Sequence, residues 1–199
     1  MQAPGGPEED TSGNFNRGGW VPGYWDSFME KAMRDQMGKP YDLLLGRKTY
    51  EIFADYWPKA KADQFANKLN KARKYVVSTT LRKLEWNNSI LVTGNIPEEL
   101  KKLKRKDGPE LQVHGSSNLI QTLLKHDIVD EFWLKIFPVV IGYGKKLFGN
   151  GTMPSSFKLL ESKTSPAGVI VATYRRDGEI KTGSFDLANQ TRDLKSSKA

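Results

Sequence analysis

Short buried strands alternate with helices between residues 41 and 126, and this order constrains the fold more than any other feature of the sequence. The expected strands are short and mostly apolar, which is typical of strands covered on both faces; they are residues 41–45, 74–78, 89–92 and 111–114. Amphipathic or capped helical segments lie between and around them, at residues 25–37, 47–56, 62–73, 97–107 and 117–126. Such an alternation needs right-handed crossovers, so it predicts a mainly parallel sheet with helices on its faces.

The last third of the chain has a different pattern. Residues 130–140 form one long β-prone stretch, and residues 157–162 and 169–174 are separated by Ser165-Pro166-Ala167-Gly168. Two β-prone runs around a Pro- and Gly-containing turn predict a hairpin. The sequence therefore predicts an α/β fold of three layers, in which a mixed sheet, mainly parallel with a C-terminal antiparallel hairpin, is flanked by helices.

Length and composition limit the domain count and the chemistry. A chain of 199 residues is long enough for one core, so we expect one domain over residues 1–183 and a flexible polar tail over residues 184–199. The glycine-rich residues 1–19 are predicted to form a loop or a mobile arm. The chain has no cysteine, which excludes disulfides and thiolate catalysis and fits a cytoplasmic location. No apolar run approaches the roughly 18 residues that span a bilayer, so we expect no membrane partner.

The formal net charge of +8 raises the question of nucleic-acid binding. Much of the excess comes from residues 101–106, where five of the six side chains are basic. Glu98 and Glu99 begin the same segment, and acid at the start of a helix with base at its end matches the helix dipole without any ligand. We therefore interpret this run as a solvated helix face and predict no nucleic-acid partner, with nucleic-acid binding kept as the rival interpretation.

Small, hydroxyl-bearing residues follow three of the four predicted parallel strands. In an open parallel sheet ligands bind beyond the carboxyl ends of the strands, where helix N-termini present free amides. Each cluster alone is typical of a helix cap, but three at one edge favour a long ligand with several phosphates, such as a dinucleotide. The candidate cofactor-binding residues are Gly46, Arg47, Thr49, Ser78, Thr79, Thr80, Gly115, Ser116, Ser117 and Asn118. Ser116 or Ser117 could equally cap the helix that follows.

Two common phosphate-binding motifs are absent. The first predicted strand is not followed by Gly-x-Gly-x-x-Gly, and no Gly-x-x-x-x-Gly-Lys-Ser/Thr loop occurs. These absences argue against a Rossmann dehydrogenase and a P-loop NTPase.

Four segments together resemble the RibD C-terminal domain family, which shares the dihydrofolate reductase fold. They are residues 42–50, 78–81, 115–124 and 128–148. The resemblance runs in order over residues 1–183, and the combination is more specific than any one segment. It implies a dihydrofolate reductase-like sheet, NADPH as cofactor, a small-molecule substrate and a homodimer formed through the strand that begins at Asp130.

The resemblance also implies roles for individual residues. Arg47 and residues 78–80 would lie near the adenosine 2′-phosphate, Thr49 near the pyrophosphate, and residues 115–118 around the diphosphate. The predicted substrate-binding residues are Trp20, Phe53, Trp57 and Pro138. For Phe53 and Trp57 the alternative is a place in the core, and for Trp20 it is either a mobile loop over the site or a simple anchor.

Members of this family usually begin with a β-strand that ends in Ser-Leu-Asp-Gly, followed by a segment like residues 1–7. By resemblance that strand would lie between the strands at 111–114 and 130–138, with its Asp facing the substrate. Met1 thus resembles an internal methionine. Unpaired backbone groups in a sheet are costly, so we expect either a truncated or misassigned start, or a sheet whose neighbouring strands close the gap.

These features predict hydride transfer from NADPH to a C=N or C=O group of a pyrimidine- or pterin-like ring. The reduction of 5-amino-6-(5-phosphoribosylamino)uracil in riboflavin biosynthesis is the activity that gives the family its name. The alternative is a non-catalytic NADP(H)-binding protein with a regulatory or interaction role. No general acid is predicted, and His114 and His126 are poor candidates because of their places at a strand end and a helix end.

Overall fold

The computed structural model describes residues 1–60 and 64–185. Its strands are β1 (Tyr41–Gly46), β2 (Lys74–Val77), β3 (Ser89–Val92), β4 (Glu110–Gln112), β5 (Glu131–Ile136), β6 (Phe157–Thr164) and β7 (Ile170–Arg176). Its helices are α1 (Ser27–Gln36), α2 (Arg47–Tyr56), α3 (Gln64–Lys71), α4 (Ile96–Lys104) and α5 (Ser117–Lys125), with short 3-10 turns at Ser12–Asn14 and Pro22–Tyr24. The predicted strand and helix alternation is therefore confirmed, and each described helix begins within two residues of its predicted start.

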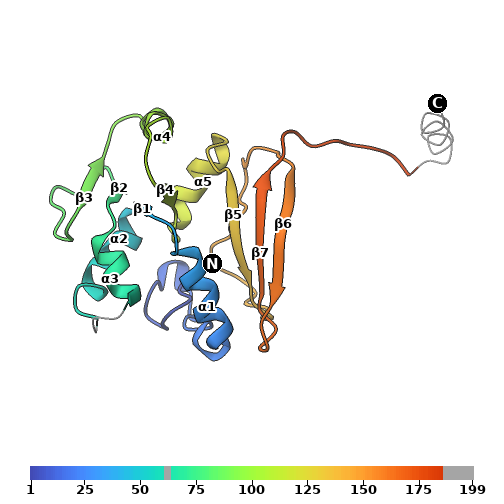
Figure 1. The fold of residues 1–199 in the computed structure, drawn as a ribbon, viewed down its shortest axis with the longest axis horizontal. Coiled ribbons are helices and arrows are strands. Elements are labelled where there is room, and N and C mark those ends of the chain that lie inside the picture. The colour runs from blue at the N-terminus through green and yellow to red at the C-terminus, as the bar shows by residue number, and fades with distance from the viewer. Residues whose placement is uncertain (61–63, 186–199) are drawn as a thin grey trace.

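The strands form two sheets that stand side by side (Figure 1). The first is parallel, with the order β3-β2-β1-β4, and the second is antiparallel, with the order β5-β7-β6. The parallel sheet and the C-terminal hairpin were both predicted. Among the described residues β4 and β5 are not paired with each other, so the expectation that neighbouring strands close the gap is wrong.

Two helices cover β1, one on each face, and one of them also packs against the second sheet. Met37, directly after α1, packs in one core cluster with Leu43 and Leu45 of β1. On the opposite face α5 belongs to a second cluster that contains both Leu44 of β1 and Phe132 of β5. Since alternate residues of β1 enter the two clusters, this strand is covered on both faces, as its continuous apolar sequence predicted.

A polar bridge crosses the space between the sheets. The backbone carbonyl of Gln36 accepts a hydrogen bond from Gln112 Nε2 of β4, at 3.0 Å, and Gln36 Oε1 accepts one from Lys135 Nζ of β5, at 2.6 Å. The end of α1 thus bonds to both facing strand edges. These side-chain contacts, together with the core cluster that contains Leu44 and Phe132, fix the sheets relative to each other without a shared ladder.

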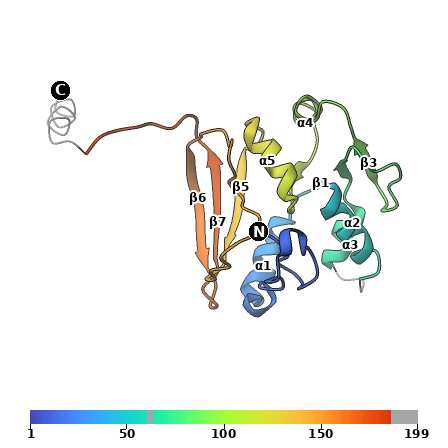
Figure 2. The same cartoon turned by 180° about the vertical axis from the view of Figure 1, so that it is seen from behind.

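Two expected boundaries are corrected by the structure. The strand predicted over residues 130–140 ends at Ile136, because Pro138 has no amide to continue the ladder and Val139 N turns back to Phe137 O, at 2.8 Å. The N-terminal segment is a loop, as expected, but not a mobile arm. Gln2, Ala3 and Phe15 are at most 4% exposed, and Figures 1 and 2 show the N-terminus at the centre of the molecule.

Candidate functional site

The three predicted junctions lie at one edge of the parallel sheet. Gly46 at the end of β1 pairs in register with Val77 at the end of β2, and β4 runs parallel to β1 on its other side. The amide of Gly46 donates a hydrogen bond to Ser116 Oγ at 2.6 Å. The junctions β1–α2 and β4–α5 are therefore in direct contact, although 70 residues separate them in the sequence.

Backbone conformation keeps this contact close. A Cβ built on Gly46 would lie 3.0 Å from both Cβ and Oγ of Ser116, and one built on Gly115 would lie 3.7 Å from Thr49 Oγ1. Gly115 has a φ of +93°, which glycine adopts without strain. Ser116 has a φ of 73° and lies in the left-handed region, which is uncommon for a residue with a side chain. Gly46 and Gly115 thus allow the β1–α2 junction to approach the β4–α5 junction closely.

The helices that begin at this edge have no side-chain caps from their N-cap residues. Gly46 precedes α2 and cannot supply one, and Ser116 precedes α5 without making one. Of the two alternatives that the sequence offered, Ser116 occupies the N-cap position of α5, but its hydroxyl bonds across to Gly46 instead of capping the helix. Ser117 is the first residue of α5 itself. Helix N-termini without side-chain caps present amide donors and a positive dipole end to an anion.

At the junction after β2, one of the candidate hydroxyls already forms hydrogen bonds within the turn itself. Ser78 is buried, and its hydroxyl accepts hydrogen bonds from the amides of Thr80, at 3.2 Å, and Leu81, at 3.0 Å. This turn fits the cap interpretation that the sequence left open. Thr79 and Thr80 are exposed beside it, so their side chains are the accessible part of this junction.

Arg47 is exposed in the first turn of α2. Its Nη1 lies 3.1 Å from Glu51 Oε1, in an ion pair between side chains that are both 44% exposed. Exposed pairs of this kind contribute about 0 to 1 kcal/mol. A phosphate can therefore displace Glu51 from the guanidinium at little cost.

The predicted substrate residues fall into two separate groups. Phe53 and Trp57 pack against the core cluster of β1 and β2, with Trp57 5.1 Å from Phe65 between ring centroids. Trp20 instead packs edge-on against Phe137, at 5.1 Å. The contacts of Phe53 and Trp57 fit the core interpretation.

The remaining predicted substrate residues lie along the N-terminal segment and after β5. Trp20 Nε1 donates to the carbonyl of Gln2, at 3.0 Å, which fits an anchor. Pro138 is exposed, and its Cγ lies 3.6 Å from the position of a Cβ on Gly168. As substrate contacts, all four residues stay predictions.

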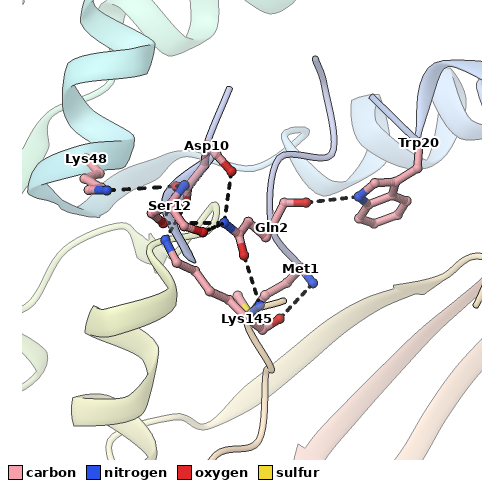
Figure 3. A network of polar contacts seen from close by, with 7 residues as sticks. All are labelled: Met1, Gln2, Asp10, Ser12, Trp20, Lys48 and Lys145. Atoms are coloured by element: carbon pink, nitrogen blue, oxygen red, sulfur yellow. Dashed lines mark hydrogen bonds and ion pairs between the residues drawn. The ribbon is translucent and has the colours of Figure 1, made fainter. Parts of the chain in front are cut away.

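A polar network that the sequence did not predict joins the N-terminal segment to this edge (Figure 3). Asp10 accepts hydrogen bonds from Lys145 Nζ and, at 2.6 Å, from Ser12 Oγ, and its Oδ1 lies 3.9 Å from Lys48 Nζ of α2. Gln2 Nε2 donates to the carbonyls of Asp10 and Ser12, at 2.9 and 2.8 Å. Lys145 and Asp10 are 135 residues apart, so no local spacing could have indicated the pair.

The network changes the proton affinity of Asp10. Burial alone raises the pKa of this carboxyl, but the hydrogen bonds from Lys145 and Ser12 outweigh it and lower the pKa to about 2. The carboxylate is therefore ionised at neutral pH. It holds Lys145 of the loop after β5 and the N-terminal segment together beside the start of α2.

We expect Lys145→Met to lower the free energy of unfolding by about 1.5 to 3 kcal/mol, because a hydrogen bond between charged groups is lost and Asp10 stays largely buried. Lys146→Met is the matched control, since Lys146 is exposed and no described contact of its side chain would be lost. Urea unfolding at pH 7 measures both. Equal stability of the two variants would contradict a role for the Asp10–Lys145 pair.

The Asp10–Lys145 pair also predicts how the stability of the unsubstituted protein changes with pH. A depressed carboxyl pKa stabilises the folded state above the unfolded value of 3.8, and this stabilisation is lost as the pH falls toward about 2. Unfolding curves recorded between pH 5 and pH 2 should therefore show a steeper loss of stability for the parent than for Lys145→Met.

The family profile of the RibD C-terminal domain matches residues 1–171. The chain belongs to this family. The uncharacterized protein YyaP of Bacillus subtilis strain 168 is 34% identical over 140 residues, which are 68% of this chain and 74% of that protein. The uncharacterized protein YwjB of the same organism is 32% identical over 62 residues, 31% of this chain and 36% of its own length.

Two solved structures share the fold. One is a protein assigned to riboflavin biosynthesis in Shewanella sp. PV-4, with a TM-score of 0.59 and 23% identity, covering 78% of this chain and 82% of its own. The other is a pyrimidine reductase-like protein from Corynebacterium diphtheriae, with a TM-score of 0.53 and 14% identity, covering 80% of this chain and 85% of its own. The resemblance to the family and its fold, inferred from four segments, is therefore confirmed.

Proposed function

We propose that this chain is an NADPH-dependent reductase that transfers hydride to a pyrimidine- or pterin-like ring. One observation carries the proposal, namely the 2.6 Å hydrogen bond that joins the β1–α2 and β4–α5 junctions. It puts two helix N-termini without side-chain caps beside each other at the carboxyl edge of a parallel sheet, as binding of a diphosphate demands. Membership of the RibD C-terminal domain family supports a reductase.

The residues at this edge fit a dinucleotide. Gly46 and Gly115 let the β1–α2 and β4–α5 junctions pack closely, and Thr49 lies beside Gly115 with a hydroxyl to donate. Bound NADPH would supply the hydride, and the chain would bind and orient it. Ser117 and Asn118 begin α5 and complete this part of the proposed site.

Arg47 supports NADPH over NADH. It supplies an exposed guanidinium at the start of α2, and the exposed Thr79 and Thr80 follow β2, whose last residue Val77 pairs in register with Gly46. A guanidinium pairs with a phosphate through two parallel hydrogen bonds. We therefore place the adenosine 2′-phosphate between Arg47 and the β2 junction.

His114 does not serve as the proton donor. Burial, followed by the nearby charge of Lys135, lowers the pKa of this histidine to about 4, so it is neutral at pH 7. Its Nε2 is hydrogen-bonded to Gln112 Oε1, at 2.8 Å. The ring is thus held within the polar bridge between the sheets, and we assign it a structural role.

The substrate class rests on the fold's relatives. A pyrimidine reductase-like protein and a protein assigned to riboflavin biosynthesis both share the architecture. We therefore propose a pyrimidine such as 5-amino-6-(5-phosphoribosylamino)uracil as the first substrate to assay, ahead of pterins.

Titration of the purified chain with NADPH, followed by nicotinamide fluorescence, tests the proposal. We expect saturable binding, and oxidation of NADPH when a pyrimidine or pterin of the right class is added. Absence of NADPH binding would contradict both the reductase and its non-catalytic alternative. Binding without oxidation across pyrimidines, pterins and quinoid compounds would favour a non-catalytic NADP(H)-binding protein.

Other expectations from the sequence stay predictions, among them the homodimer and the cytoplasmic location. Within the described ranges no helix is long and apolar enough to cross a bilayer. Three of the four lysines of the basic segment carry ion pairs, between Lys101 and Glu98, Lys102 and Glu99, and Lys104 and Asp130. These pairs fit the solvated-face interpretation of that segment.

A further inference from the structure

A pocket lies at the opposite, amino edge of the parallel sheet. It has a volume of about 750 Å³ and is lined by residues at the starts of β1, β2 and β3 and at the ends of α1 and α3. We call it the amino-edge pocket. It lies one strand length, about 17 Å at 3.3 Å per residue, from the Gly46 junction, so the two sites do not overlap.

The pocket is lined by four cationic side chains and one carboxylate. The cations are Lys39, Lys68, Lys71 and Arg73, and the carboxylate is that of Asp42. On the exposed face of α4, by contrast, Lys101 and Lys102 pair with Glu98 and Glu99.

These cations are not neutralised in that way. Within residues 1–60 and 64–185, Lys39, Lys68, Lys71 and Arg73 form no ion pair. Lys68 Nζ donates to the carbonyl of Met37, at 2.8 Å, and Arg73 Nη1 to Tyr75 Oη, at 3.2 Å. The pocket therefore concentrates positive charge that no described acid balances, apart from Asp42.

Two hydroxyls of this pocket lack hydrogen-bond partners. Three buried side-chain polar atoms are unsatisfied in the part of the chain that the structure describes, and two of them are Tyr41 Oη and Ser89 Oγ, whose residues line the pocket. Tyr41 is 8% exposed, and burial raises the pKa of its hydroxyl to about 12. Both oxygen atoms are buried, so they lie beneath the surface of the pocket and not on it.

The rest of the lining is suited to an organic molecule. Pro40, Ala72 and Ile90 contribute apolar surface, and Ile90 is 46% exposed. The volume falls within the range of roughly 300 to 1,000 Å³ found for small-molecule sites. The chemistry therefore matches a ligand with a multiply charged anionic group and an uncharged body.

We propose that the amino-edge pocket binds a small phosphorylated metabolite, whose phosphates contact Lys39, Lys71 and Arg73. A small ligand is favoured over nucleic acid because the unbalanced cations converge on one pocket, whereas the basic face of α4 is paired with acids. The proposal does not depend on reductase activity.

Calorimetric titration of the full chain with inorganic tripolyphosphate at low salt tests this site. We expect Lys39→Ala/Lys71→Ala to weaken binding at least 10-fold. Lys101→Ala/Lys102→Ala is the control, because it removes the same charge from an exposed face, and it should change affinity less than twofold. Equal losses in the two double variants would show that net charge alone attracts the anion and would overturn the proposal, as would an absence of binding to the parent.

Competition experiments test the location and the ligand class. Tripolyphosphate should bind with unchanged affinity when NADPH is saturating, and competition between them would contradict a separate site. Tighter binding of a single-stranded oligonucleotide, lost in the Lys101→Ala/Lys102→Ala control, would assign the basic surface to nucleic acid and overturn the proposal.

Discussion

Arg47→Ala should lower the affinity for NADPH about 10- to 100-fold and leave the affinity for NADH within about twofold. The reason is that a bidentate, charge-assisted pair with the 2′-phosphate contributes about 1.5 to 3 kcal/mol, and NADH lacks that phosphate. Little is lost in the free protein, because the only ion pair of Arg47 among the described residues is the exposed one with Glu51. Fluorescence titration with both dinucleotides measures the ratio of affinities.

Arg34→Ala is the matched control for this experiment. Arg34 is also an exposed arginine with a glutamate one helical turn away, Glu30, but it lies on α1. Its replacement should leave both affinities unchanged. Equal losses of NADPH and NADH affinity in Arg47→Ala would place Arg47 against a phosphate that the two cofactors share, and would contradict its assignment to the 2′-phosphate.

Sequence periodicity predicted those helices and strands whose stability depends on interactions between nearby residues or on one continuous buried face. The range of β1 follows from a mostly apolar run. The start of α1 lies two residues after the predicted one, because Asp26 caps the helix by accepting a hydrogen bond from the amide of Met29, at 2.9 Å. The end of β5 was placed too late, because the apolar pattern continues beyond Ile136 while the backbone hydrogen bonds do not.

The candidate site was predictable in its backbone and not in its side-chain partners. The junctions at Gly46 and Gly115 follow from their places after parallel strands. The contact of Ser116 with Gly46 could not be predicted, because a serine before a helix is most often a cap, and only the packing of β4 beside β1 brings the two together.

The other features that the sequence did not predict depend on contacts between residues far apart in the chain. Asp10 and Lys145 are brought together by the N-terminal segment and the loop after β5, and the cations of the amino-edge pocket come from two separate regions, at Lys39 and at residues 68–73. Neither set shares a helix turn or a strand register that would indicate a common site. Their proximity depends on tertiary packing, which one sequence read alone does not reveal.

Gly46→Ala should lower the free energy of unfolding by about 1 to 3 kcal/mol, because the added Cβ would lie 3.0 Å from Cβ and Oγ of Ser116. Ser116 cannot move away easily, since its left-handed backbone, with a φ of 73°, fixes the direction of its short side chain. Separation of the two junctions should also weaken NADPH binding. Urea unfolding and fluorescence titration measure the two effects.

Gly108→Ala is the control for the intrinsic effect of the substitution. A Cβ on Gly108 meets no atom within 4 Å, so this variant should show only the gain of about 0.4 to 1 kcal/mol that comes from a less flexible unfolded chain. If Gly46→Ala is as stable as Gly108→Ala, the close approach of the β1–α2 and β4–α5 junctions is not a real constraint on this fold.

A second substitution tests whether Ser116 is the residue that the methyl group of Gly46→Ala meets. Ser116→Gly removes the side chain that the new methyl group meets and relieves the left-handed conformation, at the loss of one hydrogen bond worth about 0.5 to 1.5 kcal/mol. Gly46→Ala/Ser116→Gly should therefore recover most of the stability lost in Gly46→Ala, with a coupling of about 1 kcal/mol or more in the double-mutant cycle. Recovered stability without recovered NADPH affinity would assign the Ser116 side chain itself to the cofactor, whereas recovery of both would show that spacing between the junctions is what binding requires.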